Sequence, residues 1–463
     1  MNPPVSKLRE ARLDFYRKKG KIHPKSVSGR FNTARWAMVW LTQIVFYGVC
    51  WLSWTTDAGA RQAVLFDIVH EKFYVFDLVL WPQDALLLAF ILILAATALF
   101  FATAMAGRLF CGFACPQTIY TSIFVWIEAK VEGDHLARLS LDQRPMSGRK
   151  LLLKSIKHGI WGLVAAWTAI TFVGYFTPIR ALLPAIAGLR VGSWETFWLI
   201  FYATFTYVQA GLAREAVCQH MCPYSRFQGV MIDSDTCSVS YDNRRGDPRG
   251  MQRQSRSKGA CIDCGICVQV CPTGIDIRDG LQYQCINCGL CIDGCDEVMD
   301  KIGAPRGLIR FMSEKELAGK AATARSRPRP RVIVYACLLF IFAALSAWTL
   351  SQRAMLRVDV LRDRGALMRE TAEGRVENTY TLKLSNMEEA PRRFRIGVGG
   401  LAGLRIEGGN EYAVEPGSVR SVALTVSSPL DSLLSGVQPI EFDAVASHDA
   451  SLAVRANSTF ILP

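Results

Sequence analysis

Eight cysteines in one short stretch constrain this chain more than any other feature of its sequence. Residues 261–295 contain two runs of the form C-x₂-C-x₂-C-x₃-C. In such a run three thiolates on a tight turn hold three corners of an iron–sulfur cubane, and the fourth cysteine reaches the neighbouring cluster. The spacing therefore predicts two [4Fe–4S] clusters, one held by Cys261, Cys264, Cys267 and Cys295, the other by Cys285, Cys288, Cys291 and Cys271.

Glycines and a proline in the same stretch support this interpretation. Gly265 and Gly289 fall inside the turns, where the backbone must approach sulfide closely. Pro272 follows the fourth cysteine of the first run, as in bacterial ferredoxins, whereas Asp296 replaces the proline after the second run. The stretch resembles a bacterial two-cluster ferredoxin set into a larger protein. Zinc sites rarely use this spacing, and disulfides require an oxidising compartment that the charges described below do not indicate.

The apolar residues of the chain come in blocks long enough to cross a bilayer. The chain has 463 residues, enough for more than one domain, and 51% of them are hydrophobic. A hydrocarbon core of about 30 Å requires about 20 apolar residues in a helix. The sequence thus predicts five transmembrane helices, at residues 36–54, 85–107, 159–176, 196–213 and 332–350.

The positive charges of the chain flank these blocks and predict an orientation. The formal net charge is +13, and basic residues crowd the first 35 residues and the loop at 108–157. Acidic residues instead dominate the loop at 57–84. The positive-inside rule places the basic segments and the clusters in the cytoplasm, and the residues after 350 in the periplasm, of a bacterial inner membrane. Because the charges do not gather on one face, we expect no nucleic-acid partner.

The C-terminal segment has the pattern of a β-sandwich. Tyr380, Leu382 and Leu384 alternate with polar residues, and turn formers such as Pro416-Gly417 separate several runs of this kind. We therefore expect a membrane α-helical protein with an inserted ferredoxin-like domain and a C-terminal all-β, immunoglobulin-like sandwich. The expected regions are a basic cytoplasmic tail (1–35), a four-helix membrane region (36–232), the ferredoxin-like domain (233–312), a basic linker (313–331), the fifth helix (332–350) and a periplasmic sandwich (351–463).

Four further cysteines form a second constellation. Cys111 and Cys115 make a C-x₃-C-P motif after the second predicted span, and Cys218 and Cys222 make another after the fourth. This repetition predicts a membrane region of two similar halves. Cysteines at i and i+4 share a helix face and are close enough to ligate one metal. Four soft thiolates suit Cu(I), zinc or an iron–sulfur cluster. His220, inside the second motif, is a further candidate ligand.

A purely structural role is the alternative for these four cysteines, because cysteine packs well as a small hydrophobe. A single C-x₃-C pair would favour that alternative. Two copies at equivalent places, each followed by proline and both beside a cluster domain, favour a metal or redox role. Cys237 lies between the motifs and the cluster stretch, and we assign it no role.

Together these features resemble the FixG/RdxA/CcoG group of cytochrome oxidase accessory proteins. The resemblance covers nearly the whole chain and includes the stretch just before the clusters, DSDTCSVSYDNRRGDPRG at 233–250. It implies a role in assembling cbb₃-type cytochrome c oxidase, with Cu(II) reduced to Cu(I). It also implies that the C-x₃-C-P cysteines handle the copper, and that oxidase assembly factors and copper carriers are partners.

We interpret the chain as a membrane-bound oxidoreductase. Electrons from an unidentified cytoplasmic donor would pass through the two clusters to copper, which is bound as substrate by the C-x₃-C-P thiolates. Thiolates stabilise Cu(I), and donor, clusters and copper would all lie at one membrane face. Two alternatives remain: a quinol-oxidising membrane ferredoxin of a respiratory chain, and a non-catalytic assembly scaffold. The sequence leaves a homo-oligomer open.

Overall fold

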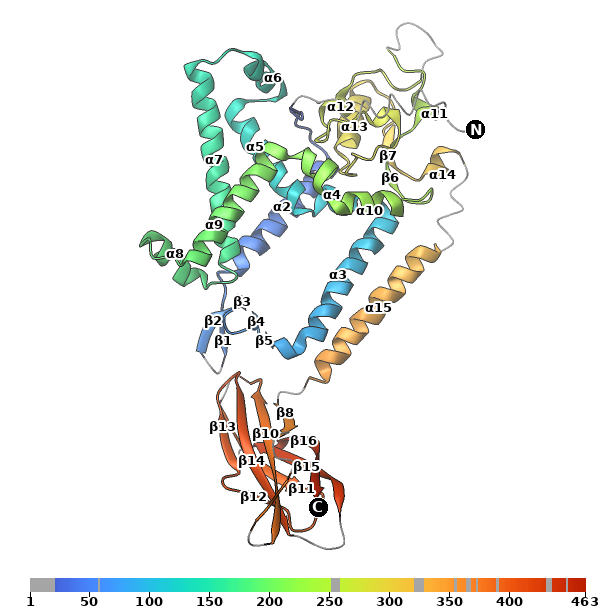
Figure 1. Cartoon of the computed structure of the whole chain (residues 1–463). Coiled ribbons are helices and arrows are strands. Elements are labelled where there is room, and N and C mark those ends of the chain that lie inside the picture. The colour runs from blue at the N-terminus through green and yellow to red at the C-terminus, as the bar shows by residue number, and fades with distance from the viewer. Residues whose placement is uncertain are drawn as a thin grey trace. The chain divides into compact units, whose positions relative to one another are not determined.

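The computed structural model describes most of the chain, and the described residues form two compact units (Figure 1). The described ranges are 21–56, 59–250, 259–319, 329–353, 356–363, 368–371, 374–388, 391–429, 435–446 and 449–463. The first unit takes the described residues up to Trp51 and from Ala89 to Ala344, and the second takes Leu52–Leu88 and Leu345–Pro463. Residues 1–20 of the predicted tail and 320–328 of the predicted linker lie outside the described residues.

Helices make up most of the first unit before the cluster stretch. In chain order they are α2 (Arg30–Val49), α3 (Ala85–Ala106), α4 (Leu109–Phe113), α5 (Pro116–Glu132), α6 (His135–Gln143), α7 (Gly148–Val173), α8 (Ile179–Ala187), α9 (Ser193–Thr206), the π-helices η2 (Tyr207–Ala213) and η3 (Val217–Met221), and α10 (Pro223–Met231). α7 and α9 pack side by side (Figure 1). Buried Trp161 of α7 stacks on Phe124 of α5 with ring centroids 5.2 Å apart, so α5 and α7 share a core.

Four helices among the described residues are long and apolar enough to cross a membrane. They are Ala85–Ala106, Leu109–Glu132, Gly148–Val173 and Pro330–Ser351, the last of which is α15. No residue in the apolar window of α15 is buried, so most of its apolar surface is open, as expected of a helix in contact with lipid. The chain is therefore a membrane protein by the composition of its helices.

The prediction of five spans was wrong in number. α2 takes up most of the first predicted span but begins at Arg30, includes the polar Gln43 and ends at Val49. In the fourth predicted span the α-helix α9 has only 14 residues, because the backbone changes to the π-helix η2 at Tyr207. Conversely, the segment Leu109–Glu132, which comprises α4 and α5, is long and apolar enough to cross a membrane, although the sequence analysis predicted a loop there.

The last turns of α5 carry two buried carboxylates. Glu128 is fully buried, and its oxygens lie 2.6 Å from Lys21 Nζ and 2.8 Å from an Arg214 nitrogen. Glu132 lies 2.8 Å from Lys157 Nζ. This ion cluster joins α5 to the N-terminal segment, to α7 and to the end of η2.

The cluster stretch folds as a small domain within the first unit. Its elements are β6 (Ser238–Tyr241), α11 (Asn243–Gly246), α12 (Ile266–Gln269), η5 (Ile277–Asp279), α13 (Leu290–Lys301), β7 (Ile309–Met312) and α14 (Glu314–Leu317). β6 and β7 pair antiparallel, with Ser238 opposite Met312. The two strands thus bring both ends of the cluster stretch together, and Val239 and Ile309 join its core.

The second unit contains the predicted immunoglobulin-like sandwich. One sheet has the order β12-β14-β10-β8, with β9 also paired to β10, and the other has the order β13-β11-β15-β16. The strands are β8 (Leu356–Arg362), β9 (Arg369–Glu370), β10 (Arg375–Asn386), β11 (Arg392–Gly399), β12 (Arg405–Glu407), β13 (Glu411–Val414), β14 (Val419–Pro429), β15 (Gly436–Ala446) and β16 (Asp449–Leu462). The alternation expected around Leu382 is present, because every second residue of β10 is buried between the sheets.

Residues 52–88 add short strands to this unit that the sequence analysis did not predict. β1 (Ser53–Thr56) pairs with β2 (Gly59–Gln62), and β3 (Val64–Asp67), β4 (Lys72–Val75) and β5 (Leu78–Leu80) form a second small sheet. A short 3₁₀ helix, η1 (Pro82–Asp84), follows. An Arg353 nitrogen lies 2.7 Å from an oxygen of Asp84, so the residues before α3 are fixed to those after α15.

The sandwich core provides a stability test. Phe442 of β15 is completely buried and packs on Tyr380 with ring centroids 5.1 Å apart, so Phe442→Ala should lower the free energy of unfolding of this unit by about 3–5 kcal/mol. Val437→Ala on the same strand is the control, because Val437 is 62% exposed and its loss should cost about 0.5 kcal/mol or less. Pulse proteolysis of the full chain in urea measures both. Equal losses in the two variants would contradict this core.

Candidate metal centre

The two cysteine runs adopt the same backbone conformation. Asp263 and Gly265 in the first run have φ of 56° and 68°, and Asn287 and Gly289 at the equivalent positions of the second have φ of 53° and 74°. Each glycine then caps a helix, α12 or α13. Such left-handed conformations favour glycine, which explains the sequence C-x₂-C-G in both runs.

The structure brings each predicted ligand set together around a cavity. One small cavity is lined by Cys261, Cys264, Cys267 and Cys295. A second is lined by Cys271, Cys285, Cys288 and Cys291, and Cys267 also reaches it. The fourth cysteine of each run thus lies with the first three of the other run, as the spacing predicted.

The chemistry of these thiols fits an iron–sulfur cluster. Burial raises the pKa of Cys285 and of Cys295 to about 12. Because thiolates, not thiols, bind iron, these side chains must release their protons when a cluster binds. When bound, a [4Fe–4S] cluster supplies one-electron transfer. The protein's part is to hold the thiolates and to set the charge around them.

The two C-x₃-C-P motifs also repeat one local geometry. In each, the second cysteine is extended and caps a helix whose first residue is the proline: Cys115 precedes α5 and Cys222 precedes α10. Cys111 Sγ lies 3.3 Å from Gln228 Oε1 on α10, so the first motif reaches the helix of the second. Burial, and then the neighbouring Cys115 and Cys222, raise the pKa of Cys218 to about 11.

The expected copper ligands do not form a complete site in this structure. Among the residues that the structure describes, no three His, Cys, Asp or Glu side chains are close enough to hold a single metal ion. His220 is exposed at the surface. Cys237 is half-buried, and its backbone oxygen lies beside Gly107. This contact involves the backbone and not the thiol, so the structure assigns the thiol no function.

Gly112, inside the first C-x₃-C-P motif, packs directly against the second cysteine run. A Cβ atom on Gly112 would lie 2.6 Å from the backbone oxygen of Ile286 and 2.9 Å from Cα of Cys288. Cys111 also packs on the apolar cluster that contains Cys288. The first motif therefore lies against the turn that binds the second cluster.

Three polar side chains fix this contact. Arg108 donates hydrogen bonds to the carbonyl oxygens of Tyr283 and Ser225, the latter at 2.6 Å, and so joins the cluster stretch to α10. Asn287 donates to the Ala106 carbonyl at the end of α3, at 3.3 Å. Asp293 of α13 accepts from the backbone N–H groups at the start of α2, the shorter bond measuring 2.7 Å to Asn32.

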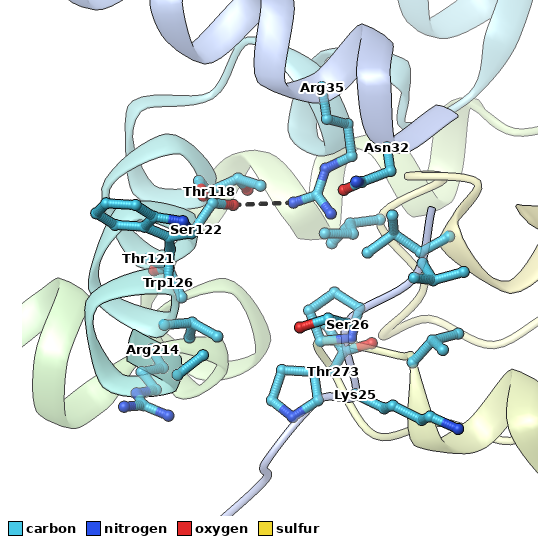
Figure 2. A pocket seen from close by; sticks show the side chains of 18 of the residues that line it. Lys25, Ser26, Asn32, Arg35, Thr118, Thr121, Ser122, Trp126, Arg214 and Thr273 are labelled. Carbon is cyan, nitrogen blue, oxygen red and sulfur yellow. Dashed lines mark hydrogen bonds between the residues drawn. The ribbon is translucent and has the colours of Figure 1, made fainter. Parts of the chain in front are cut away.

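A cavity of about 350 Å³ opens next to this contact (Figure 2). Arg35 and Asn32 of α2, and Thr118, Ser122 and Trp126 of α5, line one side, as Figure 2 shows. Thr273, Ile286 and Leu290, which lie next to the second cluster site, line the other side. Cys218 of the second C-x₃-C-P motif also reaches the cavity. The cavity thus borders both the second cluster site and the second C-x₃-C-P motif.

Several residues of this centre were missed by the sequence analysis. Arg35 and Arg108 were counted only as positive charges near spans, and Gly112 was passed over between two cysteines. A glycine directly after a motif cysteine is a weak signal of close backbone approach. Nothing in the sequence indicates the partners of Asp293, which lie about 260 residues away.

Comparisons with known proteins agree with this architecture. Residues 213–314 match the model of a 4Fe-4S dicluster domain, residues 88–132 match a 4Fe-4S binding domain, and residues 346–463 match an immunoglobulin-like fold at the C-terminus of FixG. Protein RdxA of Cereibacter sphaeroides is 36% identical over 433 residues, covering 90% of this chain and 91% of that protein. The chain belongs to the FixG/RdxA/CcoG family.

Two further members of the FixG/RdxA/CcoG family match over similar lengths. The nitrogen fixation protein FixG of Rhizobium meliloti is 33% identical over 485 residues, covering 93% of each chain. Protein RdxB of Cereibacter sphaeroides is 37% identical over 400 residues, covering 83% of each chain. This FixG/RdxA/CcoG protein is thus a membrane-associated electron-transfer protein with two iron–sulfur clusters.

The contact at Gly112 can be tested with one methyl group. Gly112→Ala should reduce the iron content of the anaerobically purified protein from two clusters towards one, because the new Cβ meets backbone that cannot move aside. Gly162→Ala in α7 is the control, since a Cβ there meets nothing within 4 Å and should leave the iron unchanged. Iron and sulfide analysis, with EPR of the reduced protein, measures the effect. Full iron content in Gly112→Ala would contradict the close contact.

Proposed function

We propose that this protein reduces Cu(II) to Cu(I) for the assembly of a cbb₃-type cytochrome c oxidase, with electrons supplied through its two iron–sulfur clusters. The observation that carries the proposal is the packing of Gly112 on the backbone of Ile286 and Cys288. This contact puts a pair of soft thiols directly beside the binding turn of a one-electron carrier. Reduction of Cu(II) to Cu(I) requires one electron, which a single cluster can supply.

The four C-x₃-C-P cysteines are the proposed copper ligands. Thiolates prefer Cu(I) to Cu(II), so electron transfer to copper bound by Cys111, Cys115, Cys218 and Cys222 would be favourable. Because these thiols do not form a complete site on their own, we expect copper to draw the two motifs together when it binds. His220 is exposed and is the weakest candidate among the proposed ligands.

We further propose that the clusters face the cytoplasm and the sandwich faces the periplasm. The basic residues of the N-terminal segment, whose helix α2 is bound to the cluster domain by Asp293, support this orientation under the positive-inside rule. Cys264 of the first cluster site is exposed, which gives a soluble cytoplasmic donor a place to deliver electrons. Copper carriers and oxidase assembly factors are the partners that this function would require.

Removing one cysteine pair separates copper binding from the clusters. The double variant Cys111→Ser, Cys115→Ser should lose most of the bound copper and the Cu(II)-reducing activity while retaining two clusters, because serine is a poor ligand for Cu(I). Cys337→Ser is the control, since Cys337 is an exposed cysteine of α15 outside both motifs. Copper and iron analysis of the same anaerobic samples measures both metals. Copper retention in the double variant would refute the proposed site.

The 350 Å³ cavity favours a second candidate function, the oxidation of a membrane quinol. Its lining combines apolar walls with hydroxyl groups and several charged side chains, namely Lys25, Arg35, Arg138, Arg214 and Glu215. Its volume suits a ring-shaped head group. Trp126, at 49% exposed, lies on its rim, as tryptophans often do at a bilayer surface. If this function holds, a water-soluble quinol analogue should reduce the clusters without copper, and Trp126→Ala should slow that reduction. No reduction of the wild-type clusters by the quinol would exclude it.

A further inference from the structure

Arg35 is a buried cation without a carboxylate partner among the residues that the structure describes. Only 9% of it is exposed. Its Nε donates to the Gly112 carbonyl at 3.1 Å, and a terminal nitrogen donates to Ser122 Oγ at 3.0 Å, as the dashed line in Figure 2 shows. Both acceptors are neutral. A buried charge is costly unless an opposite charge lies near it, so the position of Arg35 calls for an anion.

The second cluster site supplies that anion. The Gly112 carbonyl that binds Arg35 belongs to the residue that packs against Ile286 and Cys288. Arg108 reaches the same site, because it donates a hydrogen bond to the carbonyl of Tyr283, two residues before Cys285. A cubane held by four thiolates carries a net negative charge, and this charge grows on reduction.

The first cluster site has a different charge environment. Its nearby cation, Arg278, is neutralised by two carboxylates: a terminal nitrogen lies 2.6 Å from an oxygen of Asp276, and another donates to Asp263. Asp296 directly follows the ligand Cys295, and the second cation near this site, Arg249, is itself bound to Asp247. Carboxylates therefore outnumber cations around this site, whereas two arginines and one carboxylate, Asp293, lie near the second site.

We propose that Arg35, together with Arg108, raises the reduction potential of the cluster at Cys271, Cys285, Cys288 and Cys291 above that of the other cluster. Cluster potentials depend on net charge, hydrogen bonds and solvent exposure. A nearby cation stabilises the more negative reduced state, and nearby carboxylates destabilise it. Burial of the second site lowers the reduction potential of its cluster, because a buried site disfavours added negative charge. The two guanidinium groups offset this lowering.

The order of potentials gives the relay a direction. One electron would pass from a reduced cluster held at the first site to an oxidised cluster held by Cys271, Cys285, Cys288 and Cys291, and no proton would move and no bond would break. The electron thereby arrives beside Gly112 and the first C-x₃-C-P motif. The location of the electron acceptor at this motif rests on the proposed function. The two reduction potentials themselves do not depend on copper.

A copper-free redox titration of the full chain, followed by EPR, tests the proposal. Arg35→Gln should lower the higher of the two potentials and leave the lower one unchanged, shifting the distribution of a single electron between the clusters by about tenfold, or about 59 mV. Arg35→Lys keeps the charge and should restore most of the wild-type value. Ser122→Ala removes a hydrogen-bond partner but no charge, and should not shift either potential. A role in packing alone would instead make the two Arg35 variants equally defective.

A substitution at the other cluster keeps the test decisive if Arg35→Gln loses iron. Asp276→Asn removes one of the carboxylates around Arg278. It should raise the lower of the two reduction potentials and so reduce the difference between the two clusters. The proposal is overturned if Arg35→Gln retains its iron and shifts neither potential, or if Asp276→Asn leaves the lower potential unchanged. If the potentials shift as expected but the protein fails to reduce Cu(II), the proposed function falls and this inference stands.

Discussion

The close approach of Gly112 to the backbone of Ile286 and Cys288 is the contact on which the rest of the first unit depends. At that distance no side chain fits between a C-x₃-C-P motif and the turn of a cluster site. Arg108 and Asn287 bind the cluster stretch to the segment that leads into the first motif, and Asp293 binds α13 to the start of α2. An electron carrier is useful only at a fixed, short distance from its acceptor. In the proposed function, the glycine and the polar side chains around it set that distance.

Repetition and asymmetry both contribute to the function. The two cysteine runs share their left-handed turns, and the two C-x₃-C-P motifs share an extended cysteine before a helix that begins with proline. Identical clusters in identical settings would give an electron no preferred direction. The charges break that symmetry, because Arg278 is paired with Asp276, while the partners of Arg35 among the described residues are neutral oxygens.

The sequence predicted those features that depend on neighbouring residues. The spacing of the cysteines indicated which of them would share a cavity, and alternation around Leu382 indicated a strand of the sandwich. Features that depend on distant residues were not predictable. Arg35 and Gly112 are 77 positions apart, and only the fold shows that one binds the other. The number of spans was wrong in part because hydropathy does not register where α9 becomes a π-helix. The strands of residues 52–88 were missed because each has only three or four residues, too few to show an alternating pattern.

The central claim is that electrons stored in the clusters pass to copper at the C-x₃-C-P cysteines. The most direct measurement reduces the clusters chemically under anaerobic conditions, removes the reductant and adds one equivalent of Cu(II). Loss of the cluster EPR signal should then match the amount of Cu(I) captured by a chelator, one electron for each copper. Clusters that stay reduced in the presence of bound Cu(II) would contradict the account.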